Sequence, residues 1–311
     1  MDAVAAAFGL GGATSWEPVS GGRAHLVWRL RTERGEWAVK RLNRSREDWW
    51  LRDYLVAAEV QLAAWERGLP MPRPVHPLEP AAPLLADVDG HSYLVHEWCE
   101  GRPPTGDVTE WVGRTMGALH DLPAGGTATW DPHPVAEWLT WLDEAPGPFT
   151  DEVRAYLPDI AEAIGLGGDA TGLTPVSSHR DFKPDNVLET AGGPLLLDWD
   201  GAGPEWAEWE LTRAAVRFSG RGEDRAAFQR VISAYEAVTG RRPPASPTSF
   251  AGLLKVYLGG AAWMVWRALG HRPVTAAERA AAGPHALELL ADLRAALGRL
   301  DEWAGWLARS T

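Results

Sequence analysis

Cysteine is almost absent from this chain of 311 residues, which contains only Cys99. A single cysteine excludes an intramolecular disulfide and argues against a cysteine-based zinc site. It also fits the reducing cytoplasm. The first eight residues carry no basic segment of the kind that opens a secretion signal. The most apolar run, residues 256–266, is too short to cross a membrane. We therefore expect a cytoplasmic globular protein with no membrane partner.

Hydrolase signatures, internal repeats and low-complexity linkers are also missing. The chain has no Gly-x-Ser-x-Gly motif and no His-Glu-x-x-His motif, so it lacks two common hydrolase signatures. Its length allows one large domain or two smaller ones, and a hydrophobic content of 45% suffices for a substantial core. The order of the patterns predicts a strand-rich front followed by a helix-rich back.

Negative charge is concentrated in one part of the chain. The net charge is −12, and residues 101–200 hold 17 Asp and Glu against 5 Lys and Arg, so the whole excess lies there. A field of this sign repels nucleic acid and attracts cations. We therefore expect no nucleic-acid partner and a cationic ligand, although a solvated acidic surface would give the same composition.

The central stretch, residues 177–204, predicts a β-hairpin with acidic residues at one end. A short apolar strand comes before a turn with two glycines, and residues 195–197 form a second strand after it. Pairing of these strands would bring Asp181, Asn186 and Asp198 together. Carboxylates and carboxamides are hard oxygen ligands that suit Mg²⁺ and a phosphate-bearing substrate. The alternative is a hairpin whose Asp and Asn side chains only cap turns.

These motifs resemble a known family. The pattern from His179 through Asp181 to Asn186, followed by Asp198 after an apolar strand, resembles the catalytic and metal loops of the protein-kinase-like phosphotransferases. Residues 198–204, Asp-Trp-Asp-Gly-Ala-Gly-Pro, are similar to the aminoglycoside-phosphotransferase branch of that superfamily. A protein substrate is disfavoured because no long activation segment and no Ala-Pro-Glu motif follow.

The resemblance implies an α+β, bilobal protein-kinase-like fold. Its small N-lobe, residues 1–97, would combine an antiparallel nucleotide-binding sheet with one helix. Its larger, mainly helical C-lobe, residues 98–311, would carry the catalytic and metal loops and the substrate-binding helices. Sequence patterns predict strands at 14–19, 25–31, 36–42, 75–78 and 93–96, and helices at 47–67, 108–122, 134–144, 150–165, 205–218, 223–239, 247–269 and 275–308.

In the predicted N-lobe, two glycines and a lysine are expected to contact the nucleotide phosphates. Gly21 and Gly22, between two strands, permit close approach of the backbone to phosphates, although a plain hairpin turn is the alternative. Lys40, in Trp-Ala-Val-Lys, would pair with the nucleotide phosphates. We predict an ion pair between Lys40 and Glu59 of the helix at residues 47–67, although an exposed helical Glu59 is the alternative.

Residues 97–101 resemble the hinge between kinase lobes. There the carbonyl of Glu97 and the amide of Cys99 would read the edge of the adenine. These are backbone roles, so side-chain identity says little about them. His96 is interpreted as an ordinary buried strand histidine behind that pocket.

The central motif supplies the chemistry that the resemblance implies. Asp181 would accept or orient the proton of the substrate hydroxyl, and Lys183 would approach the γ-phosphate. Asn186 and Asp198 would hold Mg²⁺ between the phosphates, and Asp200 would contact a second metal or the substrate.

Tryptophan is abundant, with 18 Trp against 6 Phe and 5 Tyr. Most of these indoles are expected in the core. Four residues after the metal loop are candidates for a substrate wall that pairs carboxylates with aromatic rings. They are Glu205, Trp206, Glu208 and Trp209.

We therefore predict an ATP- and Mg²⁺-dependent O-phosphotransferase that acts on a small, cationic, hydroxylated compound. An aminoglycoside or related antibiotic is favoured, with a role in antibiotic resistance. A metabolic kinase for an amino alcohol, sugar or vitamin is the alternative, and a non-catalytic nucleotide-binding pseudokinase is another. The acceptor's identity, a preference between ATP and GTP, and the oligomeric state stay open.

Overall fold

The computed structural model describes residues 1–19, 26–42, 48–168, 170–271 and 275–308. The chain divides into two compact units, each assembled from two separate segments. Unit 1 comprises residues 1–127 and 176–204, and unit 2 comprises residues 128–175 and 205–311. The predicted division into an N-lobe (residues 1–97) and a C-lobe (residues 98–311) stays a prediction.

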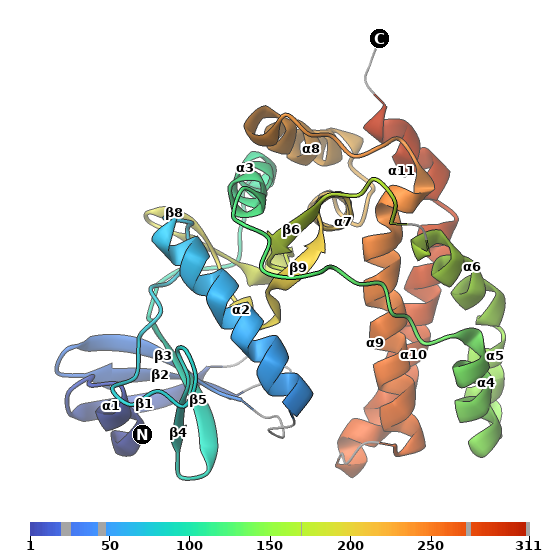
Figure 1. Ribbon diagram of the computed structural model, residues 1–311. Coiled ribbons are helices and arrows are strands. Elements are labelled where there is room, and N and C mark those ends of the chain that lie inside the picture. Colours follow the sequence, from blue (N-terminus) through green and yellow to red (C-terminus); the bar gives the residue numbers. More distant parts are fainter. Residues whose placement is uncertain (20–25, 43–47, 169, 272–274, 309–311) are drawn as a thin grey trace. The chain divides into compact units, whose positions relative to one another are not determined.

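Unit 1 contains an antiparallel five-stranded sheet in the order β1-β2-β3-β5-β4 (Figure 1). The strands are β1 (Ala13–Val19), β2 (Leu26–Thr32), β3 (Gly35–Arg41), β4 (Ala86–Val88) and β5 (His91–Glu97). The helices of this unit are α1 (Asp2–Ala7), α2 (Asp48–Glu66) and α3 (Thr109–His120). Its later segment adds η1 (Pro184–Asn186), β7 (Val187–Thr190), β8 (Gly193–Leu196) and η2 (Trp199–Gly201). The predicted α+β kinase-like fold, with an antiparallel sheet before a larger helical part, is confirmed.

Side-chain alternation along the sheet places Lys40 on the face that α2 covers. Val39 lies in the core cluster that includes Val4 of α1, whereas Leu94 of β5 lies in the cluster that includes Tyr54 of α2. Lys40 pairs directly with Leu94 across β3 and β5. Because cross-strand partners share a face and neighbours along a strand do not, Lys40 points to the α2 side.

Unit 2 is mainly helical. Its helices are α4 (Val135–Glu144), α5 (Pro148–Arg154), α6 (Leu157–Gly167), α7 (Ala207–Phe218), α8 (Arg225–Thr239), η3 (Pro247–Phe250), α9 (Ala251–Leu269), α10 (Ala276–Leu297) and α11 (Leu300–Leu307). The chain passes between the units within β6 (Pro175–Ser178) and β9 (Gly203–Trp206).

Prolines explain two differences from the predicted elements. The strand predicted at residues 75–78 is wrong, because these residues form no strand and only Pro74, just before them, makes an isolated bridge. Proline has no N–H with which to extend a ladder there. The helix predicted at residues 150–165 is divided in two. Pro158 lies in the first turn of α6, where its missing donor costs nothing, but it would break a continuous helix.

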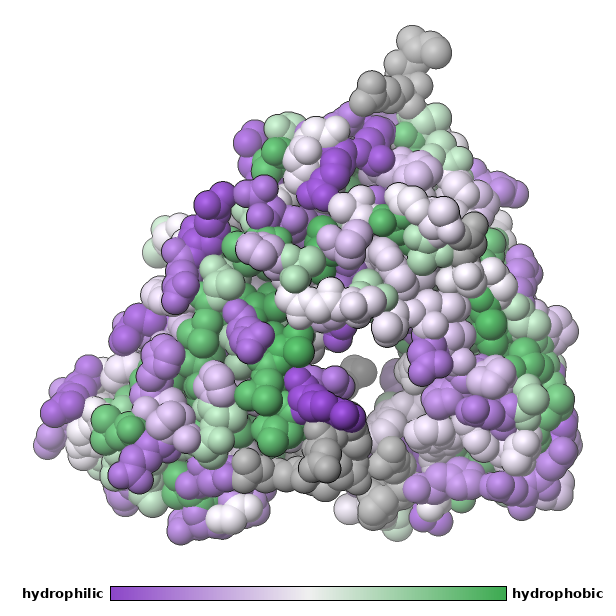
Figure 2. All heavy atoms as spheres, viewed as in Figure 1, coloured by the Kyte–Doolittle hydropathy of each residue, from purple (hydrophilic) through white to green (hydrophobic). Residues whose placement is uncertain are grey.

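The surface of the molecule is mixed in polarity. On the face in Figure 2, hydrophobic and hydrophilic residues are interspersed. Large exposed hydrophobic side chains come from separate elements, such as Trp16 on β1, Val238 on α8 and Trp263 on α9, which is ordinary for a globular protein. Every helix in the described part of the chain is too short or too polar to span a membrane.

Candidate active site

The predicted central hairpin is present in unit 1. β7 pairs antiparallel with β8, with Val187 opposite Leu196. This register places the residues just before β7 beside those just after β8, and the N–H of Leu197 donates to the carbonyl of Asn186 (2.8 Å). The loops that carry Asp181 and Asp198 therefore leave the same end of the hairpin, as the sequence predicts.

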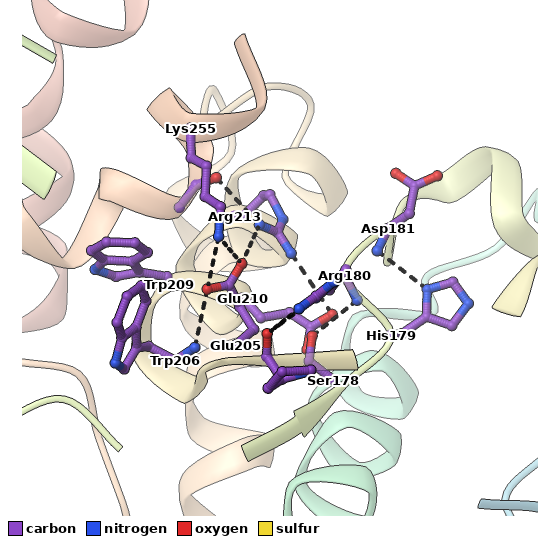
Figure 3. A network of polar contacts seen from close by, with 12 residues as sticks. Ser178, His179, Arg180, Asp181, Glu205, Trp206, Trp209, Glu210, Arg213 and Lys255 are labelled. Carbon is purple, nitrogen blue, oxygen red and sulfur yellow. Dashed lines mark hydrogen bonds and ion pairs between the residues drawn. The ribbon is translucent and has the colours of Figure 1, made fainter. Parts of the chain in front are cut away.

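A buried histidine fixes both loops. His179 has no exposed surface, and its ring Nε2 lies 3.0 Å from the carbonyl of Leu197. Its Nδ1 accepts a hydrogen bond from the backbone N–H of Asp181 (3.3 Å), as Figure 3 shows. The two contacts assign the ring proton to Nε2. The ring also packs edge-on against Trp199 (4.8 Å between centroids). One side chain thus sets the backbone of Asp181 relative to the residue that precedes Asp198.

The predicted catalytic loop gathers three predicted residues into one cluster. The carboxylate of Asp181 accepts from the ammonium of Lys183 (2.5 Å) and from the amide Nδ2 of Asn186 (2.9 Å). The same Nδ2 donates to the Asp181 carbonyl (2.8 Å). With its nitrogen committed to Asp181, Asn186 keeps Oδ1 for a cation.

Lys40 binds both carboxylates of the second loop. Its Nζ lies 2.5 Å from Asp198 Oδ1 and 2.6 Å from Asp200 Oδ2. Burial lowers the pKa of Lys40, but Asp200 and Asp198 outweigh that effect and raise the pKa above its ordinary value. The ammonium therefore stays charged. Asp198 has a left-handed backbone (φ +66°), a conformation that costs a non-glycine residue about 1 kcal/mol or more and often marks functional sites.

The predicted ion pair between Lys40 and Glu59 is wrong. Glu59 is exposed, and the described partners of Lys40 are the two aspartates. The helix places Gln61, rather than Glu59, in the interior. Gln61 and His96 meet through their Nε2 atoms at 2.7 Å. A nucleotide role for Glu59 stays a prediction.

His96 lies on the same face of the sheet as Lys40. Its pKa is lowered to about 4, chiefly by burial; the charge of Lys40 also lowers the pKa, whereas Asp200 and Asp198 oppose the shift. A neutral ring is consistent with the contact to Gln61, because an unprotonated Nε2 accepts from the amide of Gln61.

The low pKa of His96 makes stability depend on pH. Between pH 6.5, its ordinary pKa, and about 4, the unfolded state binds more protons at this group than the folded state. The free energy of unfolding should therefore fall by up to about 3 kcal/mol as pH drops through this range. Urea unfolding from pH 7 to pH 4 would measure it, with His96→Gln as the comparison. Equal pH slopes in the two proteins would contradict the assignment.

The hinge segment is attached at both ends. The N–H of Trp98 donates to the backbone of β3 (3.0 Å), and Arg102 exchanges two backbone hydrogen bonds with Glu189. The carbonyl of Glu97 accepts a long contact from the Cys99 thiol (3.9 Å). Burial raises the pKa of the Cys99 thiol. Gly21 and Gly22, the predicted phosphate loop, lie outside the described residues.

Three of the four predicted substrate-wall residues are buried in unit 2, and the fourth, Glu208, is half-buried. Trp209 has no exposed surface, and Trp206 and Glu205 are also buried. The carboxylate of Glu208 accepts from the N–H and the hydroxyl of Thr174 (3.0 and 2.9 Å), which is a structural task. Contact of these residues with an acceptor stays a prediction.

The candidate metal ligands are few. No group of three or more His, Cys, Asp or Glu side chains gathers in the described part of the chain. The predicted set consists of Asp198, Asp200 and the amide oxygen of Asn186. Mg²⁺ in kinases is bound by one or two carboxylates together with substrate phosphates and water, so this donor set fits a magnesium ion that arrives with a nucleotide.

An antiparallel sheet carrying a paired lysine, joined to a His-x-Asp loop and a carboxylate loop, defines a protein-kinase-like small-molecule kinase. The model of the phosphotransferase enzyme family matches residues 15–245, so the chain belongs to this family. No curated protein matches the chain.

Solved structures of similar fold include three kinases. Spectinomycin phosphotransferase, in complex with ADP and spectinomycin, has a TM-score of 0.64 at 12% identity. The aligned region covers 92% of this chain and 94% of the chain of that structure. The microcompartment-associated aminopropanol kinase has a TM-score of 0.62 at 16% identity, with coverage of 93% and 94%. An aminoglycoside phosphotransferase from Alicyclobacillus acidocaldarius has a TM-score of 0.56 at 17% identity, with coverage of 93% and 92%. Such identities establish the fold alone.

Proposed function

We propose that this small-molecule kinase transfers the γ-phosphate of ATP to a hydroxyl of a small, cationic compound, and that it acts in the cytoplasm. An aminoglycoside or related antibiotic is the favoured acceptor. The observation that carries the proposal is the cluster of Asp181, Lys183 and Asn186 on the loop before β7, together with the two Lys40-paired carboxylates on the loop after β8. A metabolic amino-alcohol kinase is the second candidate, because the aminopropanol kinase has a similar fold.

In the proposed reaction, the acceptor oxygen attacks the γ-phosphorus, the bond to the β,γ-bridging oxygen breaks, and ADP leaves. Asp181 accepts the hydroxyl proton. The hydrogen bond from Asn186 to Oδ2 orients this carboxylate. Lys183, whose ammonium contacts Asp181 in this structure, would move its side chain so that the ammonium contacts the γ-phosphoryl oxygens, where negative charge is concentrated.

Nucleotide contacts are assigned to the other residues of unit 1. Lys40 would grip the α- and β-phosphates, and Gly21 and Gly22 would approach them through the backbone. The Glu97 carbonyl and the Cys99 amide would bind the adenine edge. Asn186, Asp198 and Asp200 would hold Mg²⁺, which neutralises phosphate charge when bound.

A panel of aminoglycosides, amino alcohols, sugars and vitamins, assayed for ADP release, tests the proposal. Cationic hydroxylated compounds should raise ADP release above the rate with water alone, and Asp181→Asn should abolish the increase. A phosphorylated product of the expected mass should accompany it. If no compound is phosphorylated while magnesium-dependent ATP binding persists, the pseudokinase alternative replaces this function.

A cationic acceptor should make capture sensitive to salt. Residues 101–200 carry the whole net charge of the chain, so their field should speed encounter with amines. The Debye length shortens from about 30 Å at 0.01 M salt to about 10 Å at 0.1 M. The acceptor's kcat/KM should then fall while kcat changes little, at fixed free Mg²⁺ and ATP. A neutral analogue with the same hydroxyl is the control, and a flat salt response would show that the acidic segment is only a solvated surface.

A further inference from the structure

Unit 2 contains an ammonium cage formed by the carbonyl of Thr129, the carboxylate of Glu205 and the rings of Trp206 and Trp209. The chain's own Lys255, from α9, fills it (Figure 3). The Nζ atom lies 3.0 Å from the Thr129 oxygen, 3.0 and 3.4 Å from the two Glu205 oxygens, and 5.8 and 6.0 Å from the two ring centroids. Each contact is one that a primary alkylammonium ligand makes.

The cage needs a cation. Glu205 has only 2% of its side chain exposed, and a buried carboxylate without a cation is costly. Among the described residues Lys255 is the nearest cation to Glu205, and the buried Arg213 guanidinium forms a longer ion pair with it at 3.9 Å while donating to the carbonyl of Gly252. If Lys255 leaves, Glu205 keeps only this longer contact, which favours entry of another cation.

Lys255 is suited to leave. Its side chain is 33% exposed, whereas that of Arg213 is 2% exposed. Of the 30 Lys and Arg residues in the chain, only three are lysines: Lys40, Lys183 and Lys255. Lysine presents a compact ammonium on a flexible, unbranched stem, whereas arginine presents a rigid fork. An ammonium on an unbranched stem is the chemistry that an aminoalkyl ligand would bring.

We propose that the ammonium cage is an exchangeable binding site for a primary alkylammonium group, and that Lys255 is a tethered competitor that vacates it when a ligand amine enters. The identity of that ligand as the phosphate acceptor rests on the proposed function; the exchange itself does not. Because the stem of Lys255 reaches solvent, the entering group needs a similar unbranched stem. A quaternary ammonium is excluded, since it has no N–H to donate to Glu205 and Thr129.

Lys255→Ala should convert the cage into a site for an added amine. The variant should have a lower Tm than the wild type. n-Butylammonium chloride should raise that Tm and change tryptophan fluorescence, whereas tetramethylammonium chloride and sodium chloride at equal ionic strength should not. The wild type should need at least about tenfold more n-butylammonium for the same fluorescence change, because the tethered amine competes.

Arg294→Ala is the matched control. Arg294 also pairs with a carboxylate, Asp159 (2.8 Å), and lies over an aromatic ring, that of Tyr156 (4.0 Å). It lies outside the cage, so n-butylammonium should not raise the Tm of this variant. If n-butylammonium acts on Lys255→Ala no more than sodium chloride does, Lys255 is only a structural ion pair and the proposal is wrong.

The wild-type protein offers a second test that does not depend on the variant folding. With three lysines in the chain, acylation of each can be followed by peptide mass. Because free n-butylamine also consumes the acylating reagent, the rate at Lys255 is measured relative to the rates at Lys40 and Lys183, and n-butylammonium should raise this ratio several-fold. An unchanged or lower ratio would overturn the exchange. Neither test measures phosphate transfer, so a failure here is distinguishable from a failure of the proposed kinase function.

Discussion

Replacing Asp181 with Asn should lower kcat by about 10²- to 10⁴-fold, the range for a lost general base. Asn has almost the same shape and can still accept from Asn186, but it cannot take the hydroxyl proton. Nucleotide contacts are assigned to other residues, so the KM for ATP should change by less than about twofold. Steady-state kinetics with the compound that the ADP-release panel identifies as the acceptor would measure both constants.

Asp185→Asn is the control for this change. Asp185 lies on the same loop and is exposed, so its loss alters local charge without touching the cluster. Its kcat should stay within about twofold of the wild type. If Asp181→Asn keeps a near-normal kcat, another group performs the proton transfer.

Lys40→Ala should lower kcat/KM for ATP by about 10²- to 10³-fold, as loss of one oriented charge-stabilising donor does. Two effects combine, because the phosphates lose their ammonium and Asp198 and Asp200 lose the cation that they share. The strand should persist, since its register with β5 depends on backbone bonds. Lys40→Arg should restore little, because its planar fork differs from an ammonium.

Arg31→Ala separates a site effect from a general charge effect. Arg31 lies on β2 and pairs with Glu17 and Glu36 at the surface, so its kcat/KM should stay within about twofold of the wild type. Circular dichroism and Tm would establish that both variants fold. Unchanged ATP kinetics in Lys40→Ala would remove Lys40 from the nucleotide site.

Local sequence patterns predict the parts of the site that depend on short-range structure. The hairpin follows from two apolar strands around a glycine turn, and its register then places Asn186 beside Leu197. Strand alternation likewise predicts that Lys40 and Val39 face opposite sides of the sheet. These features depend on residues close in the chain, where period and turn chemistry are informative.

Features that depend on packing between distant segments could not be predicted. On α2, Glu59 and Gln61 lie two residues apart and so on roughly opposite faces, and a phase error of about half a helical turn exchanges their roles. The carboxylates around Lys40 come from a loop about 160 residues later in the chain. The burial of Trp209 also depends on such packing, since all its neighbours in the cluster except Trp206 come from distant segments.

The interleaved segments of the two units have a consequence for synthesis. Unit 1 needs residues 176–204 to complete it, and unit 2 begins at residue 128 but resumes only at residue 205. A growing chain therefore cannot complete unit 1 before most of its length has left the ribosome. Until then, the five-stranded sheet lacks the segment 176–204. Such a nascent intermediate exposes apolar surface for longer than a chain of sequential domains does. Cutting after residue 127 would separate the two segments of unit 1, so the fragment 1–127 cannot be expected to fold by itself.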